Sequence, residues 1–326
     1  MNRTTCLTAL AVLCLTATGG LASSAPPPND TVAVMAAGGL VLQRTDGIEM
    51  RSEDLYVSAA EIRVRYRFFN RSDRPLVTLV AFPMPDIVGG LEGAQAIADP
   101  SDMPFQTTVE GRRMATNIEQ KAVLNGVDHT GLLRGLELPL SPVAPATLAA
   151  IQALPTPQVE MLVDMGLVRE TPGGPVPVWT LKTTHYWNQM FPARREVDID
   201  HRYVPAVGGS AGSVMGDPGL ANSPLTADYV ARYCTDRDFV SAARRMRTRG
   251  QTVSETWIDY VLLPEATGAG PIGDFRMIVD KGGWKNLISF CGEDVRRVGF
   301  STFEVRRRNY TPTRDLSVLI LSSDRP

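Results

Sequence analysis

The chain has 326 residues, a formal net charge of −2 at pH 7 and 44% hydrophobic residues. A balance so close to neutral argues against nucleic acid, or a membrane surface, as the main partner. The length and the hydrophobic content fit one large domain or two modest domains with real cores.

The first 22 residues have the layout of a secretory signal peptide. Arg3 and the amino terminus form a short positive region, an apolar run follows, and small residues precede a predicted cleavage site after Ala22. The apolar run is too short to span a bilayer, and no later segment is long and apolar enough to do so. A lipoprotein anchor at Cys14 is the alternative, but Leu13 stands where such an anchor needs a small residue. We therefore expect export to the periplasm of a bacterium and a mature region of residues 23–326.

The first strong structural signal is the segment EIRVRYRFF at residues 61–69. Its apolar and polar residues alternate strictly, which predicts a half-buried β-strand with one solvated face. That solvated face carries Arg63, Arg65 and Arg67. A turn-like segment follows, and residues 76–82 predict a buried strand that ends at two prolines. Upstream, residues 39–45 and 48–57 predict two more strands.

The pattern changes over residues 119–170, which we interpret as a helical insertion. Apolar residues at helical spacing on both sides of a Pro-Thr-Pro break predict two short helices joined by a tight turn. Two β runs follow at 178–190 and 195–204, separated by a turn. A short helical segment is expected at about 227–250, with Thr235 as its N-cap. The rest of the chain again reads as strands.

Consecutive strands with few helices between them predict hairpin-connected antiparallel sheets rather than a parallel α/β core. The expected fold class is therefore mainly β. We expect antiparallel, β-sandwich-like sheets with a small helical-hairpin insertion and one further short helix.

The cysteines of the mature region are Cys234 and Cys291, because Cys6 and Cys14 leave with the leader. Two cysteines in an oxidising compartment most simply form one disulfide. The alternative takes Cys291, within F-C-G-E-D, as a catalytic thiol. Pairs in exported proteins are far more often structural, so the sequence predicts a disulfide between Cys234 and Cys291.

Residues 208–212 fit the G-x-S-x-G pattern, in which a hydrolase presents a nucleophilic serine, here Ser210. That motif requires a strand-to-helix turn, followed along the chain by an acid and then a histidine. The three histidines of the mature region, His129, His185 and His201, all precede Ser210, and glycines and prolines follow it. We therefore interpret the stretch as a loop of small residues that leaves a strand, and we predict no catalytic residue.

His185 and His201 are weak candidates for a metal site. If residues 178–190 and 195–204 pair as a hairpin in an even register, the two imidazoles lie opposite each other. Zinc takes three or four ligands, however, and no Cys-x-x-Cys or His-x-x-x-His spacing is present. The favoured interpretation is two buried rings with hydrogen-bond partners, so we expect no metal and no cofactor.

Two further groups of residues suggest surface roles. Asp198 and Asp200 share one strand face and are expected to form ion pairs with their neighbours Arg195 and Arg202. Trp284, in the turn G-G-W-K, is expected to be exposed, where it could stack on sugars or lipids. Core or edge packing is the more common role of tryptophan in β proteins.

Several stretches are together similar to a known family. They are GGLVL (38–42), IEMRSEDL (48–55), RVRYRFFN (63–70), LVAFPMPD (79–86), HRYVPAVGGS (201–210), PIGDFRMIVDKG (271–282), SFCGE (289–293) and TPTRDL (311–316). The chain resembles a family of bacterial exported proteins known as domain of unknown function 4424. The resemblance covers nearly the whole mature region and implies a cell-envelope protein with paired cysteines. It implies no catalytic residues.

We therefore expect a non-enzymatic binding or structural module of the bacterial cell envelope. Its partner would be an envelope protein or a ligand that the sequence does not identify, and not nucleic acid. The alternative is a periplasmic hydrolase whose active site the sequence does not reveal.

Overall fold

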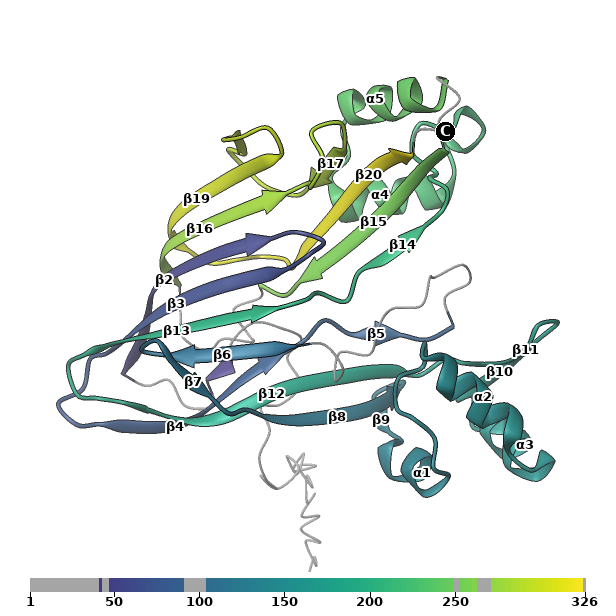
Figure 1. Cartoon of the computed structure of the whole chain (residues 1–326), viewed down its shortest axis with the longest axis horizontal. Coiled ribbons are helices and arrows are strands. Elements are labelled where there is room, and N and C mark those ends of the chain that lie inside the picture. Colours follow the sequence, from purple (N-terminus) through teal and green to yellow (C-terminus); the bar gives the residue numbers. More distant parts are fainter. Residues whose placement is uncertain (1–40, 43–46, 91–103, 249–251, 263–270, 325–326) are drawn as a thin grey trace, which may run out of the picture. The chain divides into compact units, whose positions relative to one another are not determined.

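A computed structural model describes residues 41–42, 47–90, 104–248, 252–262 and 271–324 (Figure 1). The predicted leader, residues 1–22, lies outside the described residues. None of the helices described is both long and apolar enough to span a bilayer.

Within the described residues, the longest sheet has eight strands. In spatial order these are β18 (Arg296–Arg297), β19 (Thr302–Tyr310), β16 (Ile272–Asp280), β2 (Ile48–Val57), β3 (Ile62–Asn70), β13 (Glu196–Tyr203), β6 (Phe105–Val109) and β7 (Arg112–Met114). Neighbouring strands run antiparallel except β16 and β2, which are parallel. We call this the eight-stranded sheet.

Two smaller sheets accompany it. The six-stranded sheet contains β1 (Val41–Leu42), β4 (Leu76–Pro83), β12 (Thr180–Phe191), β8 (Asn117–Leu124) and β9 (Val127–Asp128), with β5 (Ile87–Val88) pairing to β12. The four-stranded sheet contains β14 (Gly208–Ser210), β15 (Thr252–Tyr260), β20 (Leu316–Asp324) and β17 (Leu287–Phe290). A separate hairpin joins β10 (Val168–Thr171) to β11 (Gly174–Pro177).

The main core lies between the eight-stranded sheet and both smaller sheets. The apolar face of β3, which the alternation predicted, is fully buried. It packs in one cluster with side chains such as Phe82 and Phe191 from the six-stranded sheet and Ile258 and Val318 from the four-stranded sheet. Burial of this apolar surface is the dominant stabilising contribution to the fold. The mainly β, antiparallel architecture that the sequence predicts is thus confirmed.

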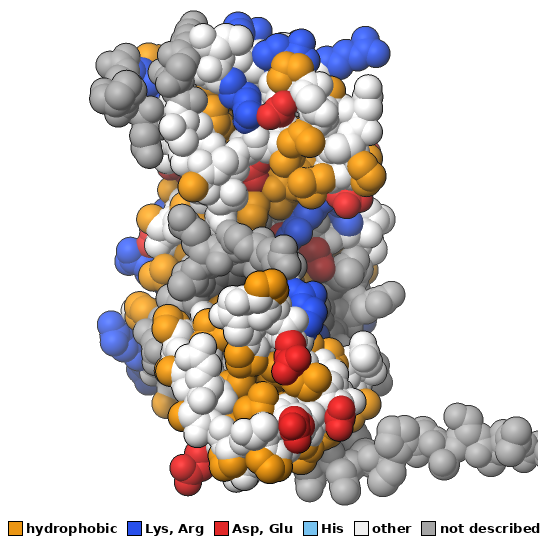
Figure 2. All heavy atoms as spheres, turned by 90° about the vertical axis from the view of Figure 1, so that its right-hand side faces the viewer, with side chains coloured by type: hydrophobic (Ala, Val, Ile, Leu, Met, Phe, Trp, Pro, Cys, Tyr) orange, Lys and Arg blue, Asp and Glu red, His pale blue; other side chains and the backbone are white. Residues whose placement is uncertain are grey.

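The helical insertion differs from the prediction at its start. Residues 117–124 form β8, and the helices begin later, with α1 (Thr130–Gly135), α2 (Pro145–Ala153) and α3 (Thr156–Asp164). The polar sequence of β8 hides its strand character because most of this strand is partly or fully exposed. The expected helix pair is present as α2 and α3, and Ile151 and Leu162 pack in its core, whereas Leu148 is exposed. Hydrophobic side chains also show on this side of the molecule, in the lower half of Figure 2.

The segment at about 227–250 contains two helices rather than one. They are α4 (Pro224–Tyr233) and α5 (Arg237–Thr248), and a short 3₁₀ turn at Pro218–Leu220 precedes them. Cys234 separates the helices in a left-handed conformation with φ of 52°. The cap of α5 is Asp236, whose Oδ1 accepts from the Phe239 backbone N–H at 2.7 Å, and not Thr235. Both helices cover the face of the four-stranded sheet that points away from the main core.

Cys234 and Cys291 are joined by a disulfide, which ties the end of α4 to the residue after β17. Ser289 Oγ also donates to the Tyr233 carbonyl oxygen at 2.9 Å, so a hydrogen bond lies beside the covalent link.

We expect a non-reducing proteolytic digest to yield the peptides of Cys234 and Cys291 as one linked species. Reduction before digestion should separate them, and mass spectrometry distinguishes the two cases. Recovery of both peptides separately alkylated, without reduction, would contradict the pairing.

Candidate functional site

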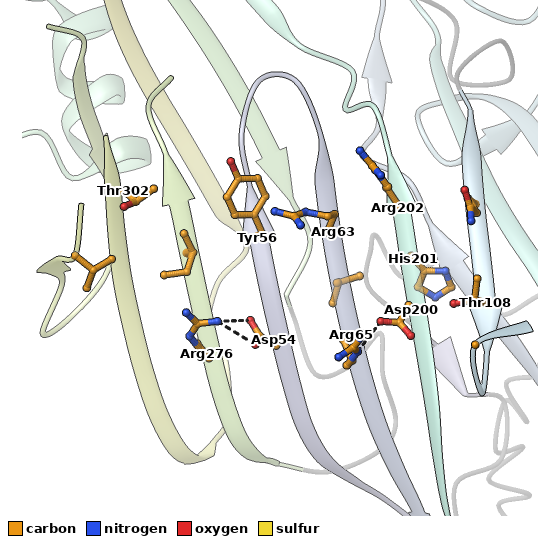
Figure 3. Close-up of a pocket in the computed structure, with 15 residues that line it drawn as sticks. Asp54, Tyr56, Arg63, Arg65, Thr108, Asp200, His201, Arg202, Arg276 and Thr302 are labelled. Atoms are coloured by element: carbon orange, nitrogen blue, oxygen red, sulfur yellow. Dashed lines mark hydrogen bonds and ion pairs between the residues drawn. The ribbon is translucent and has the colours of Figure 1, made fainter. Parts of the chain in front are cut away.

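The outward face of the eight-stranded sheet, opposite the main core, carries a hollow of about 790 Å³. Residues from six strands line it, from β6 at one side to β19 at the other (Figure 3). Gly111, in the turn after β6, and Val298, in the turn before β19, stand at its two edges. Buried Val64 and His201 form part of its floor. The charged side chains that line it are Asp54, Arg63, Arg65, Asp200, Arg202 and Arg276.

One row of these side chains crosses the strands in strict charge alternation. The cross-strand register places Arg276, Asp54, Arg65 and Asp200 in sequence across β16, β2, β3 and β13. Arg276 Nη1 donates to both carboxylate oxygens of Asp54 at 3.1 Å, and Arg65 Nε donates to Asp200 Oδ1 at 2.6 Å. The hydrogen bond to Asp200 raises the pKa of Arg65 above its usual value. Each arginine in this row is therefore matched by a carboxylate.

The neighbouring row lies two residues away on each strand, and its charges are not balanced. Here Arg63 of β3 lies directly opposite Arg202 of β13, and like charges in that position destabilise a sheet. Among the described residues, one carboxylate, that of Glu61, pairs with both arginines. It accepts from Arg63 Nε at 3.2 Å and from Arg202 Nη2 at 2.6 Å. The pair therefore retains an excess of one positive charge, and both side chains are exposed.

Across the sheet, an aromatic and an apolar side chain follow the arginines in this row. The Arg63 guanidinium lies 4.4 Å from the ring centroid of Tyr56, its cross-strand neighbour. Tyr56 OH donates to Asp280 Oδ2 at 3.0 Å, which fixes the ring. Ile278 is the next residue across the sheet, and beyond it Glu304 of β19 is paired with Arg276. Val298 adds apolar surface at the edge of the hollow. The hollow thus places an unmatched positive charge beside apolar surface.

His185 and His201 are both buried, but their strands do not form a hairpin. His185 lies on β12 of the six-stranded sheet and His201 on β13 of the eight-stranded sheet. Both rings enter the main core and stack on Phe105, at centroid distances of 3.8 Å and 5.3 Å respectively. The two strands join different sheets because the turn between them carries the chain from one layer to the other, so both apolar faces meet the same core.

Each of these histidines has one hydrogen-bond partner. His201 Nδ1 lies 2.9 Å from Thr107 Oγ1, and His185 Nδ1 lies 3.4 Å from Thr116 Oγ1. Burial lowers the pKa of His185 to about 4 and the pKa of His201 to about 3, so both are neutral at pH 7. Across the described residues, no three His, Cys, Asp or Glu side chains gather as metal ligands do.

The structure places Ser210 on a short strand, β14, and not on a turn into a helix. β14 pairs antiparallel with β15, and Ser210 Oγ accepts from the Gly212 backbone N–H at 3.3 Å. Glycine is needed here for space, because a Cβ at Gly209 would lie 2.7 Å from the Glu255 carbonyl oxygen. Cys291 is held in the disulfide and offers no free thiol.

The ion pairs expected for Asp198 and Asp200 are present, but with other partners. Asp198 pairs with Arg67 and Asp200 with Arg65, across from them on β3, rather than with Arg195 and Arg202. The alternation of β3 identified these arginines as outward-facing. The sequence did not predict the hollow, because a single sequence does not show that β13 and β2 flank β3 and that β16 lies beyond β2.

The chain is similar to a defined protein family over most of its length. Residues 28–319 match the model described as "Domain of unknown function (DUF4424)", and the chain belongs to this family. No curated protein matches the chain. A crystal structure from Legionella pneumophila, described as a "putative nutrient binding protein", is 14% identical, with 87% of this chain and 70% of that chain covered at a TM-score of 0.41. So low a TM-score does not establish a common fold, and it supports no functional conclusion for this chain.

Proposed function

We propose that the protein is an exported, non-enzymatic binding module of the bacterial cell envelope. Its ligand carries an anionic group, such as a carboxylate or a phosphate, and binds in the hollow on the outward face of the eight-stranded sheet. The observation that carries this proposal is the opposed pair of Arg63 and Arg202, which share one carboxylate inside a hollow of about 790 Å³.

The charge pattern of the hollow favours an anion at this pair rather than elsewhere in it. Arginine presents a planar fork of donors that matches carboxylate and phosphate oxygens. Arg276 already donates to Asp54, and Arg65 already donates to Asp200. Arg63 and Arg202, by contrast, share the carboxylate of Glu61. An anion bound between the two would relieve the repulsion of like charges, and the Tyr56 ring would cover its apolar part.

The hydrolase alternative gains no support from these contacts. The Ser210 hydroxyl accepts from a backbone N–H, Cys291 is disulfide-bonded, and the rings of His185 and His201 are enclosed by aromatic side chains. The arrangement of nucleophile, base and orienting group that covalent catalysis requires is therefore not assembled from these residues.

The proposal is tested by thermal unfolding with three probe anions at fixed ionic strength: inorganic phosphate, citrate and benzoate. A ligand that binds only the folded state stabilises it by RT ln(1 + [L]/Kd), so the melting temperature rises with the ligand concentration. We expect at least one anion to raise it for the wild type and no anion to do so for the double variant Arg63→Gln/Arg202→Gln.

The matched control is Arg67→Gln. Arg67 lies on the same strand and the same face as Arg63, with a similar exposed fraction (46% against 54%), and it pairs with Asp198 outside the hollow. It should keep the wild-type response. Equal responses from the wild type and the double variant, or no response to any anion, would overturn the assignment of the site.

A further inference from the structure

Two adjacent turns at one end of the eight-stranded sheet present large aromatic side chains to solvent. Trp284 lies in the turn 281–286 between β16 and β17, and its exposed fraction is 70%. Phe300 lies in the turn 298–301 between β18 and β19, and its exposed fraction is 86%. Large aromatic residues exposed to this degree are uncommon on soluble proteins, and a group of them marks an interaction site.

The two turns form one surface. The Lys281 backbone N–H donates to the Ser301 carbonyl oxygen at 3.0 Å, so the turns lie side by side at the ends of β16 and β19 (Figure 1). Val298, in the second turn, and Val295, just before β18, are exposed by 52% and 38% and add apolar area to this end of the sheet. We call Trp284, Val295, Val298 and Phe300 the aromatic tip.

Both turns are held in place by side-chain hydrogen bonds to the backbone. Lys281 Nζ donates to the carbonyl oxygens of Trp284 and Asn286, and Asn286 Nδ2 donates back to the Lys281 carbonyl oxygen at 2.9 Å. In the second turn, Arg297 Nη2 donates to the Phe300 carbonyl oxygen at 2.8 Å. The aromatic rings therefore stand on ordered turns that are formed before any partner binds, which reduces the entropy lost on binding.

The charges of the first turn and of β18, which leads into the second turn, all have the same sign. Residues 281–286 and 296–301 contain Lys281, Lys285, Arg296 and Arg297 and no acidic residue. Lys285 Nζ lies 5.0 Å from the Trp284 ring centroid, and Arg296 is exposed. The nearby acids already have partners: Glu293 and Asp294 are paired with Arg307, and Asp280, just before the first turn, accepts from Tyr56 OH and from the Gly282 backbone N–H. The partner that complements this surface is therefore apolar beneath a layer of negative charge.

We propose that the aromatic tip docks on the surface of an anionic phospholipid bilayer. Tryptophan and phenylalanine insert at the level of the headgroups, and lysine and arginine beside them attract anionic lipids. A protruding pair of turns suits a flat, yielding surface. A sugar-binding platform also needs carboxylate or amide partners next to the ring, and the amide of these turns, that of Asn286, already donates to the Lys281 carbonyl oxygen. The aromatic tip shares Val298 with the edge of the hollow, but the proposal does not rest on the ligand of the hollow.

The experiment is co-sedimentation of the full chain with vesicles of pure phosphatidylcholine and with vesicles that also contain phosphatidylglycerol. Each cation near an anionic surface contributes about 1 kcal/mol, so binding should be at least about ten-fold stronger to the anionic vesicles. Trp179 and Trp187 are buried and Trp257 is half-buried, so a blue shift of the emission on binding reports chiefly on Trp284. Wild-type protein that binds neither vesicle would overturn the proposal.

The variant Trp284→Ser/Phe300→Ser should lose vesicle binding by at least about ten-fold while its melting temperature stays near that of the wild type, because both side chains are exposed. The matched control is Val77→Ser/Met190→Ser, which removes an exposed cross-strand apolar pair from the six-stranded sheet and should bind as the wild type does. Unchanged vesicle binding by the Trp284/Phe300 variant would overturn the proposal. An emission shift with maltohexaose but not with vesicles would also overturn it and assign the tip to a glycan.

Discussion

Replacing Glu53 by glutamine is expected to stabilise the protein at pH 8 by roughly 3 to 4 kcal/mol, on the scale of 1.36 kcal/mol for each unit of pKa shift. Glu53 is buried in the main core with an exposed fraction of 3%. Its Oε1 accepts from Tyr260 OH at 3.5 Å, and that hydroxyl lies 2.7 Å from Tyr66 OH. Burial raises the pKa of the Glu53 carboxyl to about 8.

The direction follows from which state binds the proton. Between pH 4.5 and pH 8 the folded protein keeps the Glu53 carboxyl protonated, whereas the unfolded chain releases that proton. Each unit of rising pH in this window therefore favours the unfolded state. Glutamine has nearly the same shape, keeps an oxygen that can accept from Tyr260 and does not ionise. The stabilisation by Glu53→Gln should thus be small near pH 5 and should grow up to pH 8.

Urea unfolding of the wild type and of Glu53→Gln at pH 5 and pH 8 measures this difference. Glu49→Gln is the control, because Glu49 lies on the same strand and is partly exposed, so its effect should be within about 0.5 kcal/mol at either pH. A Glu53→Gln variant that is no more stable than the wild type at pH 8 would show that the carboxyl is not held protonated in the core.

Glu53 also shows where sequence patterning reaches its limit. In β2, strict alternation from Ile48 and Met50 would place Ser52 and Asp54 in the core. The pairing of β2 with β3 instead shifts between Met50 and Ser52, so that Glu53 and the residues at alternate positions after it face inward. A β-bulge inserts one residue and exchanges the two faces beyond it. Because the sequence of β2 does not mark the bulge, the buried acid was not predicted.

Patterns within short stretches of the sequence predicted those features of the structure that depend on residues close together along the chain. The alternation of β3, its outward arginines and the helix pair α2 and α3 are all present. The candidate site depends instead on the order of strands across the sheet. Arg63 and Arg202 are 139 positions apart, and they become opposite neighbours through the pairing of β3 with β13. A single sequence does not determine such pairings, because any strand with one apolar face satisfies the same core.

The aromatic tip could be predicted from the sequence only in part. The turn chemistry of G-G-W-K indicated an exposed Trp284, and the structure confirms it. That Phe300 stands beside this turn follows from the pairing of β16 with β19, which the sequence does not show. The overall charge of −2 also conceals the local group of cations, because net charge averages over the whole surface.

Acidification is expected to destabilise the protein steeply, through His185 and His201. Burial lowers the pKa in the folded state to about 4 for His185 and to about 3 for His201. In the unfolded chain each ring binds a proton near pH 6.5. A depressed histidine pKa means that stability is lost as the pH falls through 6.5. By pH 4 each ring contributes a loss of about 3 kcal/mol at 1.36 kcal/mol for each unit.

Between pH 4.5 and pH 8, the effect of Glu53 on stability is opposite to that of the histidines. The three groups together define a pH at which stability is highest. Above pH 6.5, the effect of Glu53 outweighs that of the histidines and rising pH lowers stability. Below pH 6.5, the two histidines outweigh Glu53 and falling pH lowers stability by roughly 1 kcal/mol for each unit. We therefore expect the urea midpoint of the wild type to be highest near pH 6.5. His185→Gln/His201→Gln should reduce the slope of stability against pH on the acid side, whatever the absolute stability of the variant, whereas His129→Gln should leave that slope unchanged. An acid slope that the double variant shares with the wild type would assign the acid sensitivity to other groups.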